Sequence, residues 1–272
     1  MSEIKFTCTR FTRVTEEILR GSNPRTAIHV ALRETLGENY DMEFLCYTDI
    51  KGLEERPFAP EGVMLATAEN KWFAVYTEDG RLLSAGRNKY LTRGNEDLYL
   101  PEGVTCLHKR CLSSNLMSID TLHLPSRVFL AERCFEELSV QKIVYPEEGF
   151  CAYPGYIPAR AFAGSHLTEM TVWDGAYSIS QEAFKGCRHL KTVSLPSSLT
   201  HIGENAFSGC PGDLKIIFRG TRAQWESVHK SEAKVTSKMH YDNSRVGYDY
   251  ADESRQSSWI DFDTYTVECT EV

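Results

Sequence analysis

Short alternating runs of apolar and polar residues recur between residues 98 and 215 and predict a series of short strands. Each run opens with two apolar residues separated by one position, and a Pro or another turn residue then ends it. The pairs are Leu98 and Leu100, Leu122 and Leu124, Ile143 and Tyr145, Met170 and Val172, and Val193 and Leu195. They divide this part of the chain into five units, 98–121, 122–142, 143–169, 170–192 and 193–215. Self-similarity at this period predicts a solenoid.

A second apolar signal follows later in every unit. An apolar residue is followed four positions on by a small residue, and directly after that by another apolar residue. The sets are Leu107–Cys111–Leu112, Leu130–Cys134–Phe135, Ile157–Ala161–Phe162, Ile179–Ala183–Phe184 and Ile202–Ala206–Phe207. One strand cannot bury its inward side chains alone, but coils stacked about 4.8 Å apart form a continuous apolar interior. We therefore expect the four Phe side chains to stack inside the solenoid, with Gly164, Gly186 and Gly209 at the tight turns that follow.

Several short motifs carry a resemblance to a known family. They are Ala183-Phe184-Lys185-Gly186-Cys187 and Ala206-Phe207-Ser208-Gly209-Cys210, with Leu195-Pro196, Ile202-Gly203 and Leu190-Lys191. Together they resemble BspA-type leucine-rich repeats. The segment Gly220-Thr221-Arg222-Ala223-Gln224-Trp225 is similar to one that often closes such arrays, and residues 265–270 resemble the family's terminal strand. The first two units depart from the pattern, because they have Cys in place of Ala and lack the Gly-Cys pair.

The resemblance covers about residues 98–228 and, more loosely, 257–272. It implies a right-handed solenoid used for binding, mostly in bacterial and some protist proteins and often at the cell surface. It implies no catalytic residues.

The first 97 residues lack the repeat and predict a mixed fold. Asn23 is a typical N-cap residue, Pro24 suits the first position of a helix, and Gly37 is typical of a helix end. Together they predict a helix over 24–36. Residues 42–47, 63–68 and 72–77 have the pattern of strands, and Glu78-Asp79-Gly80-Arg81 has that of a hairpin turn into Leu82 and Leu83. We expect a small α+β domain over 1–97 that caps the first edge of the solenoid, whose strand edges would otherwise be unpaired.

The expected fold class is thus an α+β N-terminal domain followed by a right-handed leucine-rich-repeat solenoid over 98–228, with one short parallel strand per repeat. The segment 229–272 is expected to be acidic and to carry a closing strand. Residues 241–272 hold two basic and eight acidic side chains, within a formal net charge of −8 for the 272 residues. This charge argues against nucleic acid or an anionic membrane as the general partner.

No apolar run is long enough to span a bilayer, and the first residues lack the apolar core of a secretory signal. We therefore expect a cytoplasmic protein without membrane insertion. A location at the cell surface is the alternative, if an export signal was removed.

The nine cysteines include no C-x-x-C motif, and their odd number favours reduced thiols. Cys106, His108 and Cys111 are the nearest approach to a metal-ligand set, but no second pair lies at ligand spacing, so we predict no metal site. Cys187 lies near His189 and Cys210 near His201 in sequence, yet both cysteines occupy interior positions of the repeat, which favours buried thiols over nucleophiles.

No catalytic motif or nucleotide-binding motif occurs, so we predict no catalytic residues and no cofactor. The carboxylate pairs Glu54-Glu55, Glu136-Glu137 and Glu147-Glu148 are interpreted as solvated loop charges.

Two features indicate a binding surface. Side chains alternate along a strand, so the residue between each inward pair points outward and forms a row across the predicted sheet. The row is Tyr99, His123, Val144, Thr171 and Ser194, continued by Phe218. The long third unit adds residues 147–156 with Phe150, Tyr153 and Tyr156, which we expect beside this row because insertions in repeats map to loops, often on the binding side.

Other interpretations of these residues stay open. The row can be the exposed face of an ordinary sheet, and the three rings can fold back over the solenoid. The acidic segment 241–256 competes as a site for a basic partner, or is a solvated segment.

The functional hypothesis is a non-catalytic module that binds a protein or peptide. One alternative is an enzyme whose site lies in residues 1–97, which a pocket with a buried carboxylate, or with a Cys beside a His, would favour. Another is a fragment of a bacterial cell-surface adhesin. The sequence indicates no oligomeric state.

Overall fold

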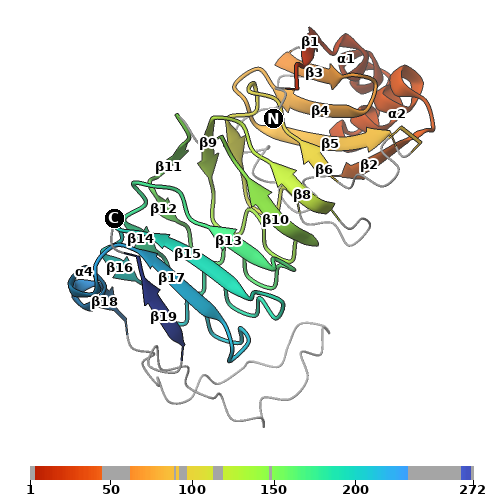
Figure 1. Cartoon of the computed structure of the whole chain (residues 1–272). Coiled ribbons are helices and arrows are strands. Elements are labelled where there is room, and N and C mark those ends of the chain that lie inside the picture. Colours follow the sequence, from red (N-terminus) through yellow and green to blue (C-terminus); the bar gives the residue numbers. More distant parts are fainter. Residues whose placement is uncertain are drawn as a thin grey trace, which may run out of the picture.

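Two series of parallel strands run along the two sides of an elongated stack of coils in the computed structural model (Figure 1). The structure describes residues 4–44, 62–88, 90–91, 97–112, 119–146, 149–231 and 265–270. The first series is β6 (Asp97–Tyr99), β8 (Ile119–His123), β10 (Val140–Val144), β13 (Glu169–Thr171), β15 (Thr192–Pro196), β17 (Lys215–Arg219) and β19 (Thr266–Cys269). The second is β7 (Cys106–Leu107), β9 (Arg127–Leu130), β11 (Cys151–Tyr153), β12 (Tyr156–Ile157), β14 (Ser178–Ile179), β16 (His201–Ile202) and β18 (His229–Lys230).

The predicted parallel-strand solenoid of about five turns is confirmed. The expectation of one strand per repeat is wrong, because each coil has a second short strand just before its small-apolar pair. Each series is split into two sheets, with strand orders β10-β8-β6 and β13-β15-β17-β19 in the first, and β11-β9-β7 and β12-β14-β16-β18 in the second. The second series divides within the long third unit, which has two such strands: β11 pairs with β9 of the preceding coil, and β12 pairs with β14 of the next.

The side chains that fill the interior of the solenoid are those that recur in the repeat. No member of the five apolar–small–apolar sets is more than 2% exposed. The rings of Phe135, Phe162, Phe184 and Phe207 form a stacked ladder, with centroids 5.2, 5.0 and 5.1 Å apart in chain order. The small residue lets neighbouring coils approach closely enough for backbone hydrogen bonds such as Phe162 N–H to Ala183 O, 2.8 Å.

The Gly-Cys pair of the repeat forms the turn that follows the Phe and links it to the preceding coil. Gly164, Gly186 and Gly209 have φ of 68°, 72° and 74°, in the left-handed region that favours glycine. The thiol of the next residue donates to the Phe carbonyl of the preceding coil, from Cys187 to Phe162 at 3.0 Å and from Cys210 to Phe184 at 3.2 Å. Each cysteine therefore satisfies a buried backbone acceptor.

The N-terminal part has a five-stranded antiparallel sheet in the order β1-β3-β4-β5-β2. Its elements are β1 (Thr7–Arg10), α1 (Thr12–Leu19), α2 (Pro24–Leu36), β2 (Tyr40–Phe44), β3 (Val63–Ala68), β4 (Trp72–Thr77) and β5 (Leu82–Asn88). The predicted helix coincides with α2, whose first turn is capped by the Asn23 side chain accepting from Thr26 N at 2.9 Å. Helix α1 was not predicted, because Phe11 at its N-cap makes no side-chain cap bond that would mark its start. Residues 45–47 of the predicted strand lie outside the described residues.

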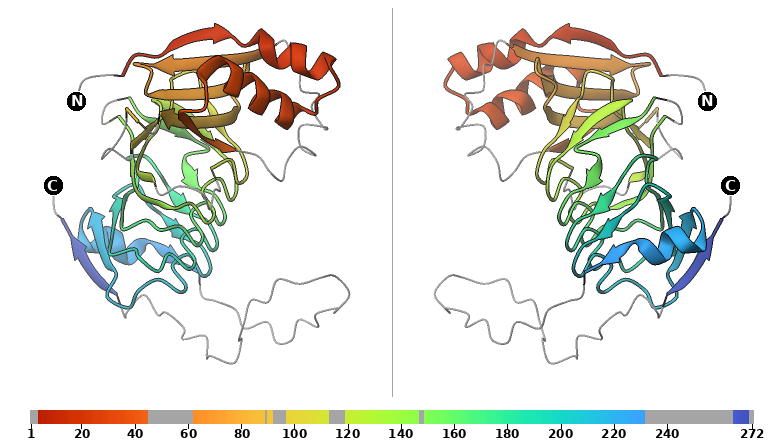
Figure 2. Two further views of the ribbon diagram at one scale, coloured as in Figure 1. Left: turned by 90° about the vertical axis from the view of Figure 1, so that its right-hand side faces the viewer. Right: turned by 90° about the vertical axis from the view of Figure 1, so that its left-hand side faces the viewer.

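The two faces of this sheet have different partners. Val63, Phe73 and Leu83 belong to a core shared with α1 and α2. Side chains of the other face, among them Trp72 and Leu82, belong to the same core as the solenoid interior. Backbone hydrogen bonds from Thr105 and Cys106 to Gly80 O join the sheet to the first coil, at 2.9 and 3.1 Å. The sheet thus covers one end of the stack (Figure 2), while the division into domains at residue 97 stays a prediction.

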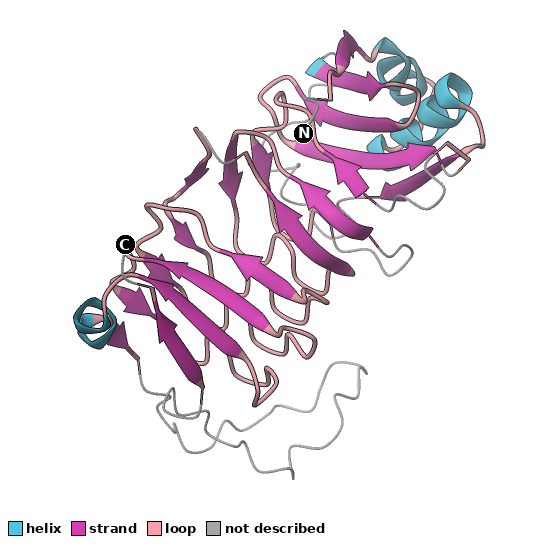
Figure 3. Ribbon diagram, viewed as in Figure 1, coloured by secondary structure: helices cyan, strands magenta, loops and turns pink. Residues whose placement is uncertain are grey.

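A short helix, α4 (Arg222–Ser227), lies at the other end of the stack, so the described helices occupy the two ends of the molecule (Figure 3). Its Trp225 is buried and its ring centroid lies 5.3 Å from that of Phe218. Thr221 and Gln224 form a capping box that starts the helix. The last described strand, β19, pairs with β17 at this end.

Candidate binding site

The predicted row lies on the outer side of the first strand series. Tyr99 and Val144 both pair with His123, and Thr171 pairs with Ser194. Phe218 is not in the row, because the parallel register pairs Ser194 with Ile217 and sets Phe218 beside the inward Leu195. Its ring is fully buried.

One end of the row is packed rather than open. The rings of Tyr99 and His123 stack with centroids 3.9 Å apart, and Trp72 contacts Tyr99 edge-on at 4.8 Å. Trp72 Nε1 donates to Asp97 O at 3.0 Å, which ties the N-terminal sheet to β6. Burial lowers the pKa of His123, although the Asp97 carboxylate, 3.5 Å from Nε2, favours the charged imidazole.

The three aromatic residues of the long unit are not brought together beside the row. Phe150 is close to it: its ring stacks on Tyr145 at 4.3 Å, and the Tyr145 hydroxyl donates to Thr171 O at 2.9 Å. Tyr153 and Tyr156 instead belong to β11 and β12, in the second strand series. The inserted residues extend that side of the coil, so these two rings lie away from the row.

Tyr153 and Tyr156 lie with two further rings on the outer side of the second series. We call Phe129, Tyr153, Tyr156 and Tyr177 the ring face. The centroids of Phe129 and Tyr153 are 5.7 Å apart, and those of Tyr156 and Tyr177 are 5.9 Å apart. A β-carbon added at Gly155 would lie 3.3 Å from the Tyr177 ring, so this ring covers the turn that joins the other two tyrosines. Phe129 is 38% exposed, Tyr153 66% and Tyr177 49%.

The sequence analysis missed Phe129 and Tyr177. Strand alternation was a usable signal for Phe129, which lies between the buried Val128 and Leu130. It was no signal for Tyr177, which precedes β14 and lies two positions before the buried Ile179, where alternation alone predicts an inward side chain.

The second strand series carries little charge. Its strands contain no Asp or Glu in the part of the chain that the structure describes, and their charged side chains are Arg127 and Lys230. The Lys230 ammonium group lies over the Trp225 ring and donates to the carbonyls of Trp225 and Val228, each at 3.1 Å. Within these strands the charge nearest the ring face is Arg127, which is exposed on the same face of β9 as Phe129.

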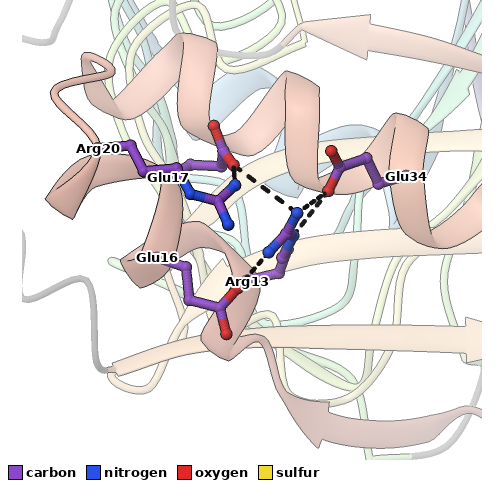
Figure 4. Close-up of polar contacts among 5 residues, drawn as sticks. All are labelled: Arg13, Glu16, Glu17, Arg20 and Glu34. Carbon is purple, nitrogen blue, oxygen red and sulfur yellow. Dashed lines mark hydrogen bonds and ion pairs between the residues drawn. The ribbon is translucent and has the colours of Figure 1, made fainter.

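Buried carboxylates in the described residues are held by arginines. The Glu17 side chain, 8% exposed, pairs with Arg20 and lies 4.0 Å from Arg13, between α1 and α2 (Figure 4). Arg13 also pairs with Glu16 and Glu34, which links the two helices. This arrangement has the character of a structural ion-pair network rather than of an acid–base pair.

Glu136 is a second buried carboxylate, and its interpretation as a solvated loop charge is wrong. Its side chain is 2% exposed and accepts from Arg110 Nε at 2.7 Å, with Arg160 Nη2 at 2.9 Å. The two arginines come from the coils on either side, so the ion pairs bind three coils together. The pairs Glu54-Glu55 and Glu147-Glu148 lie outside the described residues, as does the acidic segment 241–256.

The buried cysteines make hydrogen bonds within the solenoid core and are not grouped with other metal ligands in the described residues. His108 Nε2 lies 3.1 Å from Leu82 O, and the buried Cys111 thiol donates to Cys134 O at 3.8 Å. Hydrogen bonding to Cys187, together with burial, raises the pKa of the Cys210 thiol and keeps it protonated. Among the residues described, no three His, Cys, Asp or Glu side chains are grouped so that they could hold a metal ion.

Comparisons with known proteins identify the repeat. A family model described as a BspA type leucine rich repeat region, with six copies, matches residues 155–227. A search of curated proteins finds no match. In the described part of the chain, no helix has the length and apolar character needed to cross a membrane.

Two solved structures are similar to part of the chain. A leucine rich cell surface protein from Faecalibacterium prausnitzii is 27% identical with a TM-score of 0.43, over 49% of this chain and 35% of that one. A leucine-rich repeat protein from Bacteroides ovatus is 17% identical with a TM-score of 0.29, over 44% of this chain and 38% of that one. The matched part is thus little more than a third of either protein's length. With the stacked coils and the family match together, residues 155–227 are a BspA-type leucine-rich repeat region.

Proposed function

We propose that the chain is a non-catalytic module that binds a protein or peptide, and that the ring face is its binding surface. The observation that carries this proposal is the clustering of exposed rings. Of the six large hydrophobic side chains that are exposed among the described residues, three belong to the ring face. Aromatic side chains that cluster on a surface supply large contact area and dominate the energy of many interfaces.

The rings stand on a rigid support, which favours binding. The strands below them pair with neighbouring coils, and the side chains next to the rings along the strands, such as Val128 beside Phe129 and Ile157 beside Tyr156, are buried in the solenoid core. A surface fixed in this way loses little conformational freedom when a partner docks, and Tyr itself has few rotatable bonds to immobilise.

The absence of catalysis is supported by the state of the two buried glutamates and of the two cysteines that follow the turn glycines Gly186 and Gly209. Glu17 and Glu136 are committed to arginines, and Cys187 and Cys210 are buried and bonded to backbone carbonyls. A general base or nucleophile needs access to a substrate, and these groups have none.

Affinity capture with surface variants tests the proposal. The immobilised full chain, the double variant Tyr153→Ala/Tyr177→Ala, and the control Thr171→Arg are incubated with protein extract from the source organism. The substitutions fall on exposed side chains, so folding is expected to be retained, which thermal melts verify. We expect proteins retained by the wild-type chain and the Thr171→Arg variant to be lost from the double variant.

The control also tests the row on the first strand series, which is the second candidate surface. Thr171 lies near the middle of that row and is exposed, so an arginine there changes its shape and charge. Loss of the captured proteins from Thr171→Arg alone, with retention by the double variant, would contradict the ring face and favour the row.

A further inference from the structure

We infer that three arginines in successive coils of the solenoid, Arg110, Arg133 and Arg160, form a binding site for a doubly charged oxyanion, a phosphate or sulfate group. We call these three residues the arginine column. The inference goes beyond the proposed function and uses no side chain of the ring face, so its failure leaves that proposal unaffected.

The arginine column occupies equivalent positions of three neighbouring coils. Each arginine lies three residues after the first member of its apolar–small–apolar set and directly before the small residue. The φ angles of Arg110, Arg133 and Arg160 are 54°, 57° and 55°, so the three residues make the same left-handed turn. Arg110 N–H donates to Arg133 O at 2.9 Å, and Arg133 N–H donates to Ala159 O at 3.1 Å. Because neighbouring coils are about 4.8 Å apart, Arg133 stands between the other two arginines.

The two outer arginines are held by one carboxylate. Glu136, in the same coil as Arg133, accepts from Arg110 Nε on one oxygen and pairs with Arg160 Nη2 on the other, at 2.7 and 2.9 Å. The outer guanidinium groups therefore approach the middle coil from both sides. Arg160 is only partly satisfied, because its Nε has no hydrogen-bond partner among the described residues and lies 3.6 Å from Glu182 Oε2.

The middle arginine has no such partner. The Arg133 side chain is half-buried and makes no hydrogen bond or ion pair with the residues that the structure describes. A partly desolvated guanidinium between two like charges is unfavourable unless an anion neutralises it. The arginine column and Glu136 together leave an excess of two positive charges, which matches a divalent oxyanion.

The other carboxylates near these turns do not supply that anion. Glu182 pairs with Lys185 at 2.7 Å, and Glu132 and Glu137, which belong to the same coil as Arg133, are exposed. Water and salt screen exposed charges strongly, so these two side chains weaken the positive field of the arginine column without neutralising Arg133.

The chemistry of guanidinium selects phosphate or sulfate. Its planar fork of N–H donors pairs bidentately with two oxygens of such a group, and Arg133 spends none of these donors on the described residues. A tetrahedral oxyanion has further oxygens that can accept from an outer arginine at the same time. A carboxylate has two oxygens and a single charge, so we expect it to bind more weakly.

Isothermal titration calorimetry of the full chain tests the inference, at low and constant ionic strength and about pH 8, where phosphate groups are divalent. The probes are inorganic phosphate, inorganic sulfate and a neutral tripeptide that carries one phosphoserine, with acetate as the singly charged comparison. Arg133→Gln removes a side chain that has no partner among the described residues, and Arg133→Lys keeps its charge. The matched control is Arg188→Gln, which removes an exposed arginine of the fourth coil that also lacks such a partner.

We expect phosphate and sulfate to bind saturably to the wild-type chain and to Arg188→Gln, and at least about tenfold more weakly to Arg133→Gln, which loses the charge-assisted hydrogen bonds. Arg133→Lys is expected to bind with intermediate affinity, because it lacks the bidentate fork. Thermal melts verify that the variants are folded.

The phosphoserine peptide distinguishes the source of the group. Its binding would support the site as one for a phosphorylated partner, whereas binding of the inorganic ions alone would support a site for free ions. Absent binding of phosphate and sulfate to the wild-type chain, equal affinity of Arg133→Gln, an equal loss in Arg188→Gln, or acetate binding as tightly as sulfate would overturn the inference.

Discussion

Glu137 has a left-handed backbone conformation. At the equivalent positions of the next three coils, the residue with this conformation is glycine. Its φ is 61°, close to the 68° to 74° of Gly164, Gly186 and Gly209. A β-carbon in this left-handed region costs about 1–2 kcal/mol relative to the right-handed conformation. The second repeat lacks the Gly-Cys pair, but Glu137 makes the same turn as the glycines of the later repeats. The backbone is therefore strained at Glu137.

Replacing this residue by glycine is expected to stabilise the protein. Glu137→Gly removes the left-handed penalty but gives the unfolded chain more freedom, so we expect a net gain of about 0.5–1 kcal/mol in the free energy of unfolding. Urea denaturation measures it. The converse variant Gly186→Ala is expected to lose about 1 kcal/mol. The nearest atom to the added β-carbon is 3.9 Å away, so no clash contributes. A neutral Gly186→Ala would contradict this explanation.

At the scale of elements, the ladder of Phe rings links each coil to the next. Phe184 is fully buried between Phe162 and Phe207, with centroid distances of 5.0 and 5.1 Å. We expect Phe184→Ala to lower the free energy of unfolding by about 3–5 kcal/mol, because it opens a cavity between two coils. Phe129→Ala removes a partly exposed ring of the same size and is expected to change stability far less. Equal urea midpoints for the two variants would show that the ladder does not stabilise the solenoid.

At the scale of the whole molecule, the N-terminal sheet and the coils share one apolar core. Their junction is tight at Gly103, where an added β-carbon would lie 2.4 Å from the hydroxyl oxygen of the buried Tyr76. We expect Gly103→Ala to destabilise the protein by about 1–3 kcal/mol through overpacking. Hydrogen exchange is expected to accelerate both in β4 and in the first coil. Gly212→Ala is the matched control, since nothing lies within 4 Å of its added β-carbon.

A result in which Gly103→Ala and Gly212→Ala unfold at the same urea concentration would contradict a tight junction. Faster exchange confined to β4 would indicate that the sheet and the solenoid unfold independently, as the predicted division at residue 97 implies for two separate domains.

Local patterns were sufficient to predict the interior of the solenoid. Ile179, Ala183 and Phe184 are buried because their spacing repeats in every coil, and α2 begins where Asn23 and Pro24 mark a helix start. The repeat also predicted the ladder of rings, since equivalent residues of stacked coils must be neighbours. The candidate site was predicted in part: Tyr153 and Tyr156 were selected from the length of the third unit, but with the wrong neighbours.

Other features depended on contacts between residues far apart in the sequence. Tyr153 meets Phe129 because β11 pairs with β9, and Glu136 is buried because arginines from two other coils reach it. The sequence by itself determined which side chains of the repeated apolar sets point inward, because alternation and repeat spacing are local properties of the chain, whereas the inward direction of Phe218 depended on the register of β17 with β15. The tertiary structure alone decided which outward side chains share a surface, because that depends on which strands pair across coils.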